Sequence, residues 1–111
     1  MKGTNIGEFE ELVLLTVGLM FPDAYGLAIV EELKNQTDRK VTLSSVHKVL
    51  IRLENKAFLK SHLGGATKER GGRNKKLYQL TYLGKSVVNQ TRDLRNRMWK
   101  SIPEVVWDGK L

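Results

Sequence analysis

The chain has 111 residues, no cysteine and a net charge of +7, which fits one small domain and excludes a disulfide scaffold, a thiolate metal site and a cysteine nucleophile. No apolar run approaches the roughly 20 residues needed to cross a bilayer, so we expect a soluble, cytoplasmic protein with no membrane partner. The charge is segregated: residues 1–33 carry a net −5, residues 34–100 carry +13 and residues 101–111 carry −1. A basic middle region of this kind favours a polyanionic partner such as nucleic acid.

Two helices are predicted before residue 40. Residues 8–20 read EFEELVLLTVGLM, and their apolar side chains spread around most of the helical wheel, which is typical of a helix buried on more than one side. Pro22 breaks this helix. A second helix from about Tyr25 to Gln36 carries a single apolar stripe, as an ordinary amphipathic helix does.

A third helix is predicted from Thr42 or Ser44, either of which can be its N-cap, to about Lys56. Its buried stripe consists of apolar residues at spacings of three and four: Val46, Val49, Leu50 and Leu53. We expect five residues of its polar and basic outer face to contact DNA: Ser44, Ser45, His47, Lys48 and Arg52. The alternative to DNA contact is that this face is only a solvated helix surface. In that case Arg52 would pair with Glu54 or another acid within the chain.

Two short strands, residues 58–63 and 75–80, are predicted on either side of an eleven-residue connection that contains four glycines. Ordinary hairpin loops have about two to five residues, so a longer loop usually has a function. A thin basic loop can reach the DNA backbone or the minor groove. We therefore expect a DNA-binding wing whose cations are Lys68, Arg70, Arg73 and Lys75. The alternative is a loop whose charges only add solubility.

Thr81 is predicted to cap a final helix from Tyr82 to about Lys100, and Pro103 to end it before a frayed terminus. These predicted elements divide the chain into a DNA-binding domain at residues 1–81, a dimerisation helix at 82–102 and a flexible tail at 103–111. The first and last helices carry more apolar surface than so small a core can cover, which indicates an obligate homodimer. The expected interface residues are Leu12, Leu15, Leu83, Val87, Leu94, Met98 and Trp99.

Taken in chain order, three helices, a two-stranded hairpin with a basic loop and a last helix predict a mainly α (α+β) fold. This order is that of a winged helix-turn-helix domain followed by a long C-terminal dimerisation helix. Its physical basis is that an α-helix about 10 to 12 Å across fits the major groove of B-DNA.

Several blocks of sequence, spread over nearly the whole chain, resemble the PadR-like transcriptional regulators in the short form with a single C-terminal dimerisation helix. The blocks are GEFEELVLL at Gly7–Leu15, the pair Tyr25-Gly26, VHKVLIRLE at Val46–Glu54, ERGGRNKKLYQLT at Glu69–Thr81, and Gly84. The resemblance implies a winged-helix fold, a homodimer in which the last helix packs on the partner's first helix, and repression of nearby promoters.

The resemblance also implies a ligand site. In some PadR-like regulators, aromatic residues of the last helix face each other across the dimer and stack on planar ligands, and Trp99 is similarly placed beside Met98. The alternative is that Trp99 only anchors the dimer, because aromatic residues are favoured at interface centres.

The sequence departs from the family pattern at three positions. His47 stands where many members have tyrosine, Ser44 where glycine is common, and Ala57 where glycine usually follows the third helix. The first two changes bear on the operator sequence, and the third on whether the helix ends in a left-handed turn.

We interpret the sequence as a transcriptional regulator that binds double-stranded DNA sequence-specifically, a repressor acting as a homodimer on a palindromic operator with a planar small-molecule effector. The alternatives are an RNA-binding or architectural winged helix, and a protein-interaction module with a basic surface. No enzymatic activity, cofactor or metal is expected, because no nucleophile, base and orienting group occur together.

Overall fold

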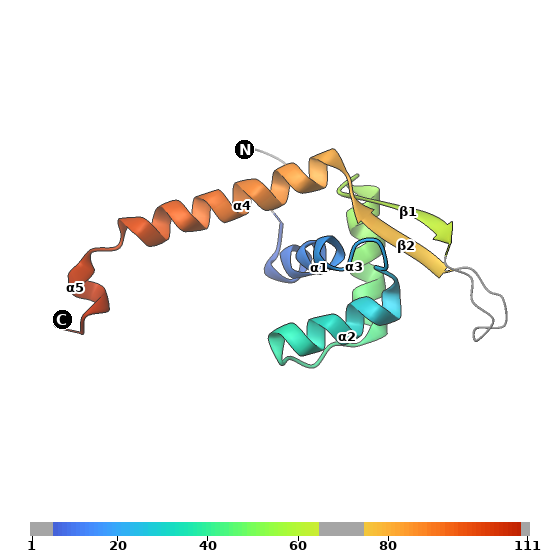
Figure 1. Ribbon diagram of the computed structural model, residues 1–111, viewed down its shortest axis with the longest axis horizontal. Coiled ribbons are helices and arrows are strands. Elements are labelled where there is room, and N and C mark those ends of the chain that lie inside the picture. The colour runs from blue at the N-terminus through green and yellow to red at the C-terminus, as the bar shows by residue number, and fades with distance from the viewer. Residues whose placement is uncertain (1–5, 65–74, 110–111) are drawn as a thin grey trace.

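The computed structural model describes residues 6–64 and 75–109. The elements in chain order are α1 (Glu8–Leu19), α2 (Gly26–Thr37), α3 (Leu43–Asn55), β1 (Leu59–Gly64), β2 (Lys75–Leu80), α4 (Tyr82–Ser101) and α5 (Glu104–Trp107). Figure 1 shows that the first three helices gather beside the hairpin as one body, whereas α4 leaves this body as an arm that ends in α5. The arm makes the molecule 61 Å long but only 30 and 21 Å across. The expected mainly α, winged-helix architecture is confirmed.

The core surrounds α1. This helix contacts α2, α3, β2 and α4, which explains why its apolar residues surround most of its circumference. Val13, Leu14 and Val17 are fully buried there. The stripe predicted for α3 also lies in the core, since Val46, Val49, Leu50 and Leu53 are all buried. Among the described residues, no helix is both long and apolar enough to span a membrane.

Helix α3 begins and ends with local hydrogen bonds that fix its limits. Thr42 is the N-cap, because its hydroxyl oxygen accepts the Ser45 N–H at 3.1 Å. At the other end the Phe58 N–H donates to the Leu53 carbonyl at 2.9 Å and the Ala57 N–H donates to the Glu54 carbonyl at 3.0 Å, the paired bonds of a Schellman motif. This motif requires a left-handed residue, and Ala57 fills that position with a φ of 65°. The turn that glycine favours is therefore present in spite of the alanine.

Replacing Ala57 with glycine should stabilise the protein by roughly 0.5–1 kcal/mol. A residue with a Cβ in the left-handed conformation costs about 1–2 kcal/mol, so removing the Cβ stabilises the folded state. Glycine also increases the conformational freedom of the unfolded chain, which offsets part of this stabilisation. Urea unfolding at a fixed protein concentration should show a higher midpoint with an unchanged slope. Ala28→Gly within α2 is the control and should lower the midpoint, because glycine weakens a helix interior by about 1 kcal/mol. A lower midpoint for Ala57→Gly would contradict the account.

The hairpin is antiparallel, and its register runs from Leu59 opposite Leu80 to Gly64 opposite Lys75. The second strand has the predicted limits, and the first begins one residue later than predicted because the Phe58 N–H completes the end of α3. The segment before α2 pairs with the free edge of β2: the Tyr78 N–H donates to the Ala24 carbonyl at 2.8 Å. This bond ties the hairpin to the helical body.

The first turn of α4 is held tightly against the junction of α3 and β1. The Thr81 hydroxyl accepts the Gly84 N–H at 3.0 Å, as predicted for an N-cap, and donates to the Ala57 carbonyl at 2.6 Å. The Thr81 N–H donates to the Phe58 carbonyl at 3.1 Å. Gly84 lies so close to the same carbonyl that a Cβ built on it would be 2.1 Å from the Phe58 oxygen. Only glycine fits at this position.

The expectation of a frayed end after Pro103 is wrong for the residues that follow it. Pro103 is the N-cap of the four-residue helix α5. The fixed φ of proline and its missing N–H suit the start of a helix as well as the end of the preceding one. The ring of Trp107 in α5 also stacks on Trp99 of α4, with centroids 4.8 Å apart and planes inclined by 28°.

Candidate nucleic-acid interface

The outer face of α3 points away from the core and carries the side chains that can contact a partner. The exposed residues of α3 are Leu43, Ser44, His47, Lys48, Ile51, Arg52 and Asn55. Within residues 6–64 and 75–109, neither His47 nor Lys48 has a hydrogen-bond or ion-pair partner on its side chain. The imidazole and the ammonium group are therefore available to an external partner.

Ser45 takes part in the cap of the helix. Its hydroxyl donates to the Thr42 carbonyl at 2.9 Å, and its side chain is half-buried. Of the five residues of α3 expected to contact DNA, Ser45 is thus the one whose hydroxyl already has a local function.

Arg52 pairs with an acid within the chain, and the acid is Glu10 of α1 rather than Glu54. The Arg52 guanidinium lies 3.4 Å and the Lys56 Nζ 3.2 Å from the same Glu10 oxygen. The other Glu10 oxygen accepts the Gly7 N–H at 2.9 Å. Glu10 is only 7% exposed, so one buried carboxylate fixes two cations along one flank of α3.

Burial by itself would raise the pKa of Glu10. The hydrogen bond from Gly7, together with Lys56 and Arg52, outweighs that effect and leaves the pKa below its ordinary value. Sequence reasoning missed Glu10 because its partners follow 42 and 46 residues later. The available signal was an acidic residue on a helix that is otherwise apolar nearly all round.

Replacing Glu10 with glutamine should lower the free energy of unfolding by about 1 kcal/mol at neutral pH, since the partners are half-exposed and the amide keeps an acceptor for Gly7. Because the pKa of Glu10 is lowered in the folded chain, its contribution is complete above the ordinary carboxyl pKa and is lost as the pH falls from about 5 toward 3. Urea unfolding from pH 7 to 3 should therefore show a flatter acid limb for the variant. Glu31→Gln, on the exposed face of α2, should leave the profile unchanged, and an identical profile for Glu10→Gln would refute the role.

The base of the wing is fixed by a second polar cluster. Glu54 of α3 accepts the Ser61 hydroxyl at 2.6 Å and pairs with the Lys76 Nζ at 3.3 Å. These contacts, with the Ser61 bond first, lower the pKa of Glu54, and the hydrogen bond to Glu54 raises the pKa of Lys76. Lys75 lies over the Tyr25 ring, its Nζ 4.3 Å from the centroid. The hairpin is thus attached to both α3 and the start of α2.

The other three expected wing cations, Lys68, Arg70 and Arg73, lie outside the described residues. The described strands end at Gly64 and Lys75, at the end of the hairpin remote from α4 (Figure 1).

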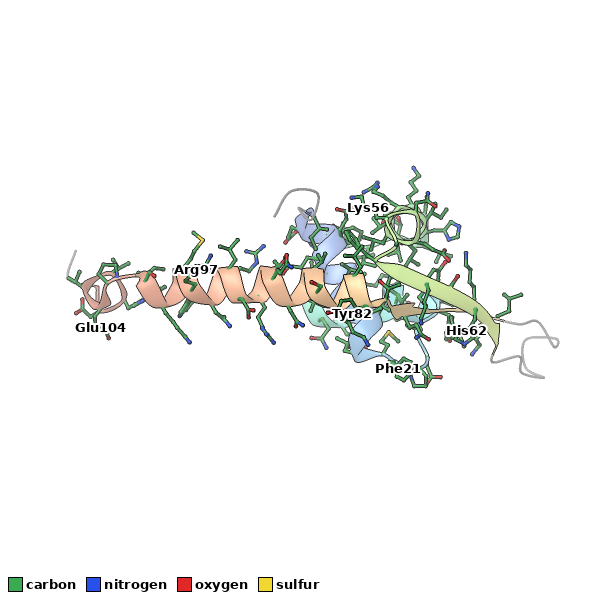
Figure 2. The ribbon with its side chains drawn as sticks, turned by 90° about the horizontal axis from the view of Figure 1, so that it is seen from above. Phe21, Lys56, His62, Tyr82, Arg97 and Glu104 are labelled. Carbon is green, nitrogen blue, oxygen red and sulfur yellow. The ribbon has the colours of Figure 1, made fainter. Side chains whose placement is uncertain are left out.

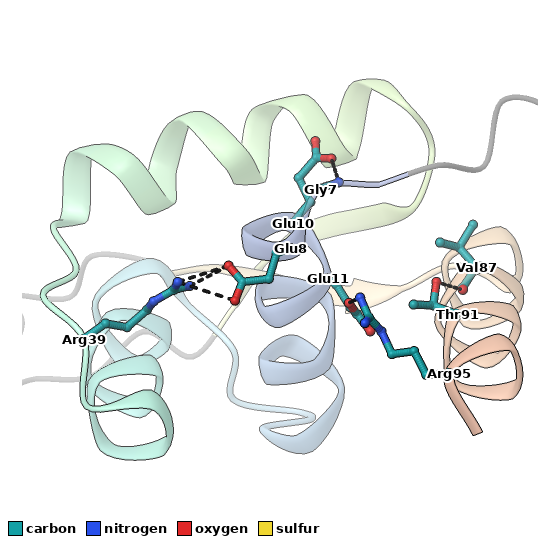
Figure 3. A network of polar contacts seen from close by, with 8 residues as sticks. All are labelled: Gly7, Glu8, Glu10, Glu11, Arg39, Val87, Thr91 and Arg95. Atoms are coloured by element: carbon teal, nitrogen blue, oxygen red, sulfur yellow. Dashed lines mark hydrogen bonds and ion pairs between the residues drawn. The ribbon is translucent and has the colours of Figure 1, made fainter. Parts of the chain in front are cut away.

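The acidic first turn of α1 connects three other parts of the chain. Glu8 pairs with Arg39, in the loop before α3, and Glu11 pairs with Arg95 of α4, each with a nitrogen–oxygen distance of 3.0 Å. Figure 3 shows both pairs. Glu10 completes the set through α3. One turn of α1 is therefore bonded to both α3 and the arm, in addition to the direct contact of α4 with the α3–β1 junction.

The expected dimer residues fall into two groups. Leu15, Leu83, Leu94, Met98 and Trp99 are exposed, and Leu12 is half-buried. Val87 is 1% exposed and belongs to the core of its own chain, so it is removed from the expected interface. The arm carries further exposed apolar residues that the sequence analysis did not include: Val105, Val106 and Trp107. Figure 2 shows how far Arg97 and Glu104 lie from the body.

In the ligand site expected at Trp99, only one face of the Trp99 ring is without a stacking partner from the described part of the same chain. Trp107 of the same chain covers one face of the Trp99 ring, so that face already has a stacking partner. Trp99 as a whole residue is still 64% exposed, and Met98 is 62% exposed.

The described part of the chain contains no group of three or more histidine, aspartate or glutamate side chains that could hold a metal ion.

A three-helix body, a two-stranded wing and a long helix after the wing define a winged helix-turn-helix protein. Residues 14–90 match the model of the transcriptional regulator PadR-like family, and the chain belongs to this family. Members of the family are transcription regulators, not enzymes. No curated protein matches the sequence.

Solved structures share the fold at low sequence identity. A PadR-like transcription factor from Bacteroides fragilis is 22% identical over 84% of each chain, with a TM-score of 0.68. A PadR-like regulator from Bacillus cereus is 17% identical over 84% of this chain and 85% of that one, with a TM-score of 0.69. FabT of Streptococcus pneumoniae, solved in complex with DNA, is 19% identical over 99% of this chain and 73% of its own, with a TM-score of 0.67.

Proposed function

We propose that the protein is a repressor that binds double-stranded DNA sequence-specifically, as a homodimer on a palindromic operator in the cytoplasm. The observation that carries the proposal is the outer face of α3, where Ser44, His47 and Lys48 are exposed on an element of the right width for the major groove. The likeness to FabT, which was solved bound to DNA, supports it.

The proposed contacts divide into two kinds. Ser44, His47 and Lys48 reach base edges, because they lie in the first half of α3, the part of such a helix that enters the groove. Arg52, on the flank of α3 beside Glu10, and Lys75 with the other wing cations bind phosphates. Phosphate contacts supply most of the affinity, and base contacts supply the specificity.

The proposed homodimer forms through the arm. Leu94 and Met98 lie one helical turn apart on α4 and are 46% and 62% exposed, and neighbouring exposed apolar side chains mark a candidate interaction site. Packing of the arm on the partner's α1 would cover Leu15 as well. The two copies of α3 would then lie about 34 Å apart, one turn of DNA.

The proposed effector is a planar, hydrophobic small molecule, cationic or neutral, that stacks on the exposed face of Trp99 beside Met98. It would regulate the protein only by binding the DNA-free form of the dimer more tightly than the DNA-bound form. In a Trp107→Phe background, planar dyes should quench the fluorescence of Trp99. Unquenched emission from an intact dimer would leave Trp99 as an interface anchor only.

Replacing Arg70 and Arg73 with alanine should weaken binding to all DNA sequences alike. The slope of log affinity against log salt should fall by roughly 0.9 for each phosphate that the variant no longer neutralises. Lys48→Ala should instead change the ranking of operator variants, because removing a hydrogen bond to a base costs roughly 1 to 3 kcal/mol only where that base is present. An unchanged slope in the first variant would exclude the wing from the interface.

The function itself is tested by selecting binding sites for the full chain from random duplex DNA. A palindromic sequence should be enriched, with half-sites one turn apart. Enrichment of no sequence would overturn the proposal and favour an architectural, RNA-binding or protein-binding role.

A further inference from the structure

Ile51 is an apolar side chain on the outermost part of α3. It is 44% exposed and lies seven residues after Ser44, three after Lys48 and four before Asn55, a spacing that puts all four on one face. The buried stripe of α3 is on the opposite face. Ile51 does not belong to the core cluster or to the partly buried residues that pack against it.

The environment of Ile51 on the helix is polar. At spacings of three and four it is flanked by His47, Lys48, Glu54 and Asn55. Leu43 of α3 is also exposed, but it lies eight residues, more than two helical turns, before Ile51. Two apolar side chains so far apart make too small a patch for a protein partner or a second copy of the chain. The larger exposed apolar set, including Leu94 and Met98, lies on the arm instead.

In the absence of a partner, Ile51 contributes little to the stability of α3. Its helix propensity is lower than that of lysine or arginine, and its exposed surface gains nothing from burial within the chain. In a major groove it can form no hydrogen bond with a base edge or a phosphate. The apolar group that the groove does offer is the 5-methyl of thymine.

We propose that Ile51 contacts the 5-methyl group of a thymine and is a specificity-determining residue, an inference that rests on the proposed DNA-binding function. Lys48 and Ser44, on the same face, would fix neighbouring bases through hydrogen bonds, while Ile51 selects thymine by apolar contact. Cytosine, which lacks the methyl group, would be disfavoured at that position of the operator.

The test uses the full chain and the duplex enriched by selection from random DNA. Each thymine is replaced in turn, in both half-sites, by deoxyuridine, which removes the methyl group and keeps Watson–Crick pairing. Affinities are measured by fluorescence anisotropy at one salt concentration for the wild type, Ile51→Val and Ile51→Ala. Circular dichroism checks that the variants are folded, as expected for an exposed position.

For the wild type, replacing the thymine at one particular position of a half-site should lower the affinity for the duplex about threefold to tenfold for each half-site changed. This is the size expected for burying one methyl group. Ile51→Ala should abolish this penalty at that position only, and Ile51→Val should keep most of it. Leu27→Ala, which truncates an exposed aliphatic side chain of α2, should leave the whole profile unchanged.

The proposal is overturned if no deoxyuridine position affects the wild type, or if Ile51→Ala keeps the same penalty. Failure of the selection to enrich any sequence is a different result, since it contradicts the proposed function before Ile51 is tested.

Discussion

Replacing Gly84 with alanine should unfold much of the protein under conditions in which the wild type is folded. The new Cβ would lie 2.1 Å from the Phe58 carbonyl oxygen. That oxygen accepts the Thr81 N–H, and the N–H of the same residue, Phe58, closes the end of α3. The backbone therefore cannot yield without disrupting three elements. We expect a loss of about 3 kcal/mol or more, out of a total of roughly 5–15 kcal/mol for a small domain.

Circular dichroism in urea measures this effect at a fixed protein concentration. Gly18→Ala in α1 is the matched control, because its Cβ would meet only the flexible Cδ1 of Leu80 at 3.2 Å, and alanine favours the helix by about 1 kcal/mol. That variant should stay close to the wild type. An unchanged midpoint for Gly84→Ala would contradict the close approach of α4 to the α3–β1 junction.

The second large effect is expected at the arm. Leu94→Glu combined with Met98→Glu should convert the proposed homodimer into folded monomers, because two carboxylates in each chain would lose their hydration in an apolar interface. Light scattering should give the chain mass of 12.6 kDa for the variant and twice that mass for the wild type. DNA affinity should fall steeply, because each half-site would then bind alone.

Asn96→Glu is the control for this effect, since Asn96 is an exposed residue of α4 two positions from Leu94 and so on the other side of the helix. It should leave the dimer intact. A wild-type protein that is a folded monomer at micromolar concentration would contradict the dimer proposal directly.

Local patterns were sufficient to predict much of the fold. Spacings of three and four identified the buried stripe of α3, and Thr81 followed by a periodic apolar run identified the start of α4. The limits of β2 followed from its turn signals and its apolar content. These features depend on interactions among near neighbours in the chain, which sequence reasoning can evaluate.

Most of the features that were missed depend on interactions that the local sequence pattern does not decide. The periodicity of α4 shows that Val87 is buried but not whether it faces its own core or a partner. A proline such as Pro103 can end one helix and also begin the next. Here it begins α5, and Trp107 of α5 stacks on Trp99. The pairing of Glu10 with α3 joins residues 42 and 46 positions apart.

For the candidate site, four of the five residues expected on the outer face of α3 are exposed, Ser45 is half-buried in the cap, and Ile51 was not among the five. An exposed isoleucine carries no hydrogen-bonding group, so a search for polar and basic residues passes over it. Its exposure became evident only when the helix was placed against the core.

The central claim is that the chain reads a DNA sequence, and a competition titration tests it most directly. The full chain is bound to the selected duplex at fixed salt concentration and displaced either by the same duplex or by a scrambled duplex of equal length and composition. We predict that the scrambled duplex competes at least about a thousandfold more weakly, and that two chains bind each operator. Equal competition by the two duplexes would contradict the claim.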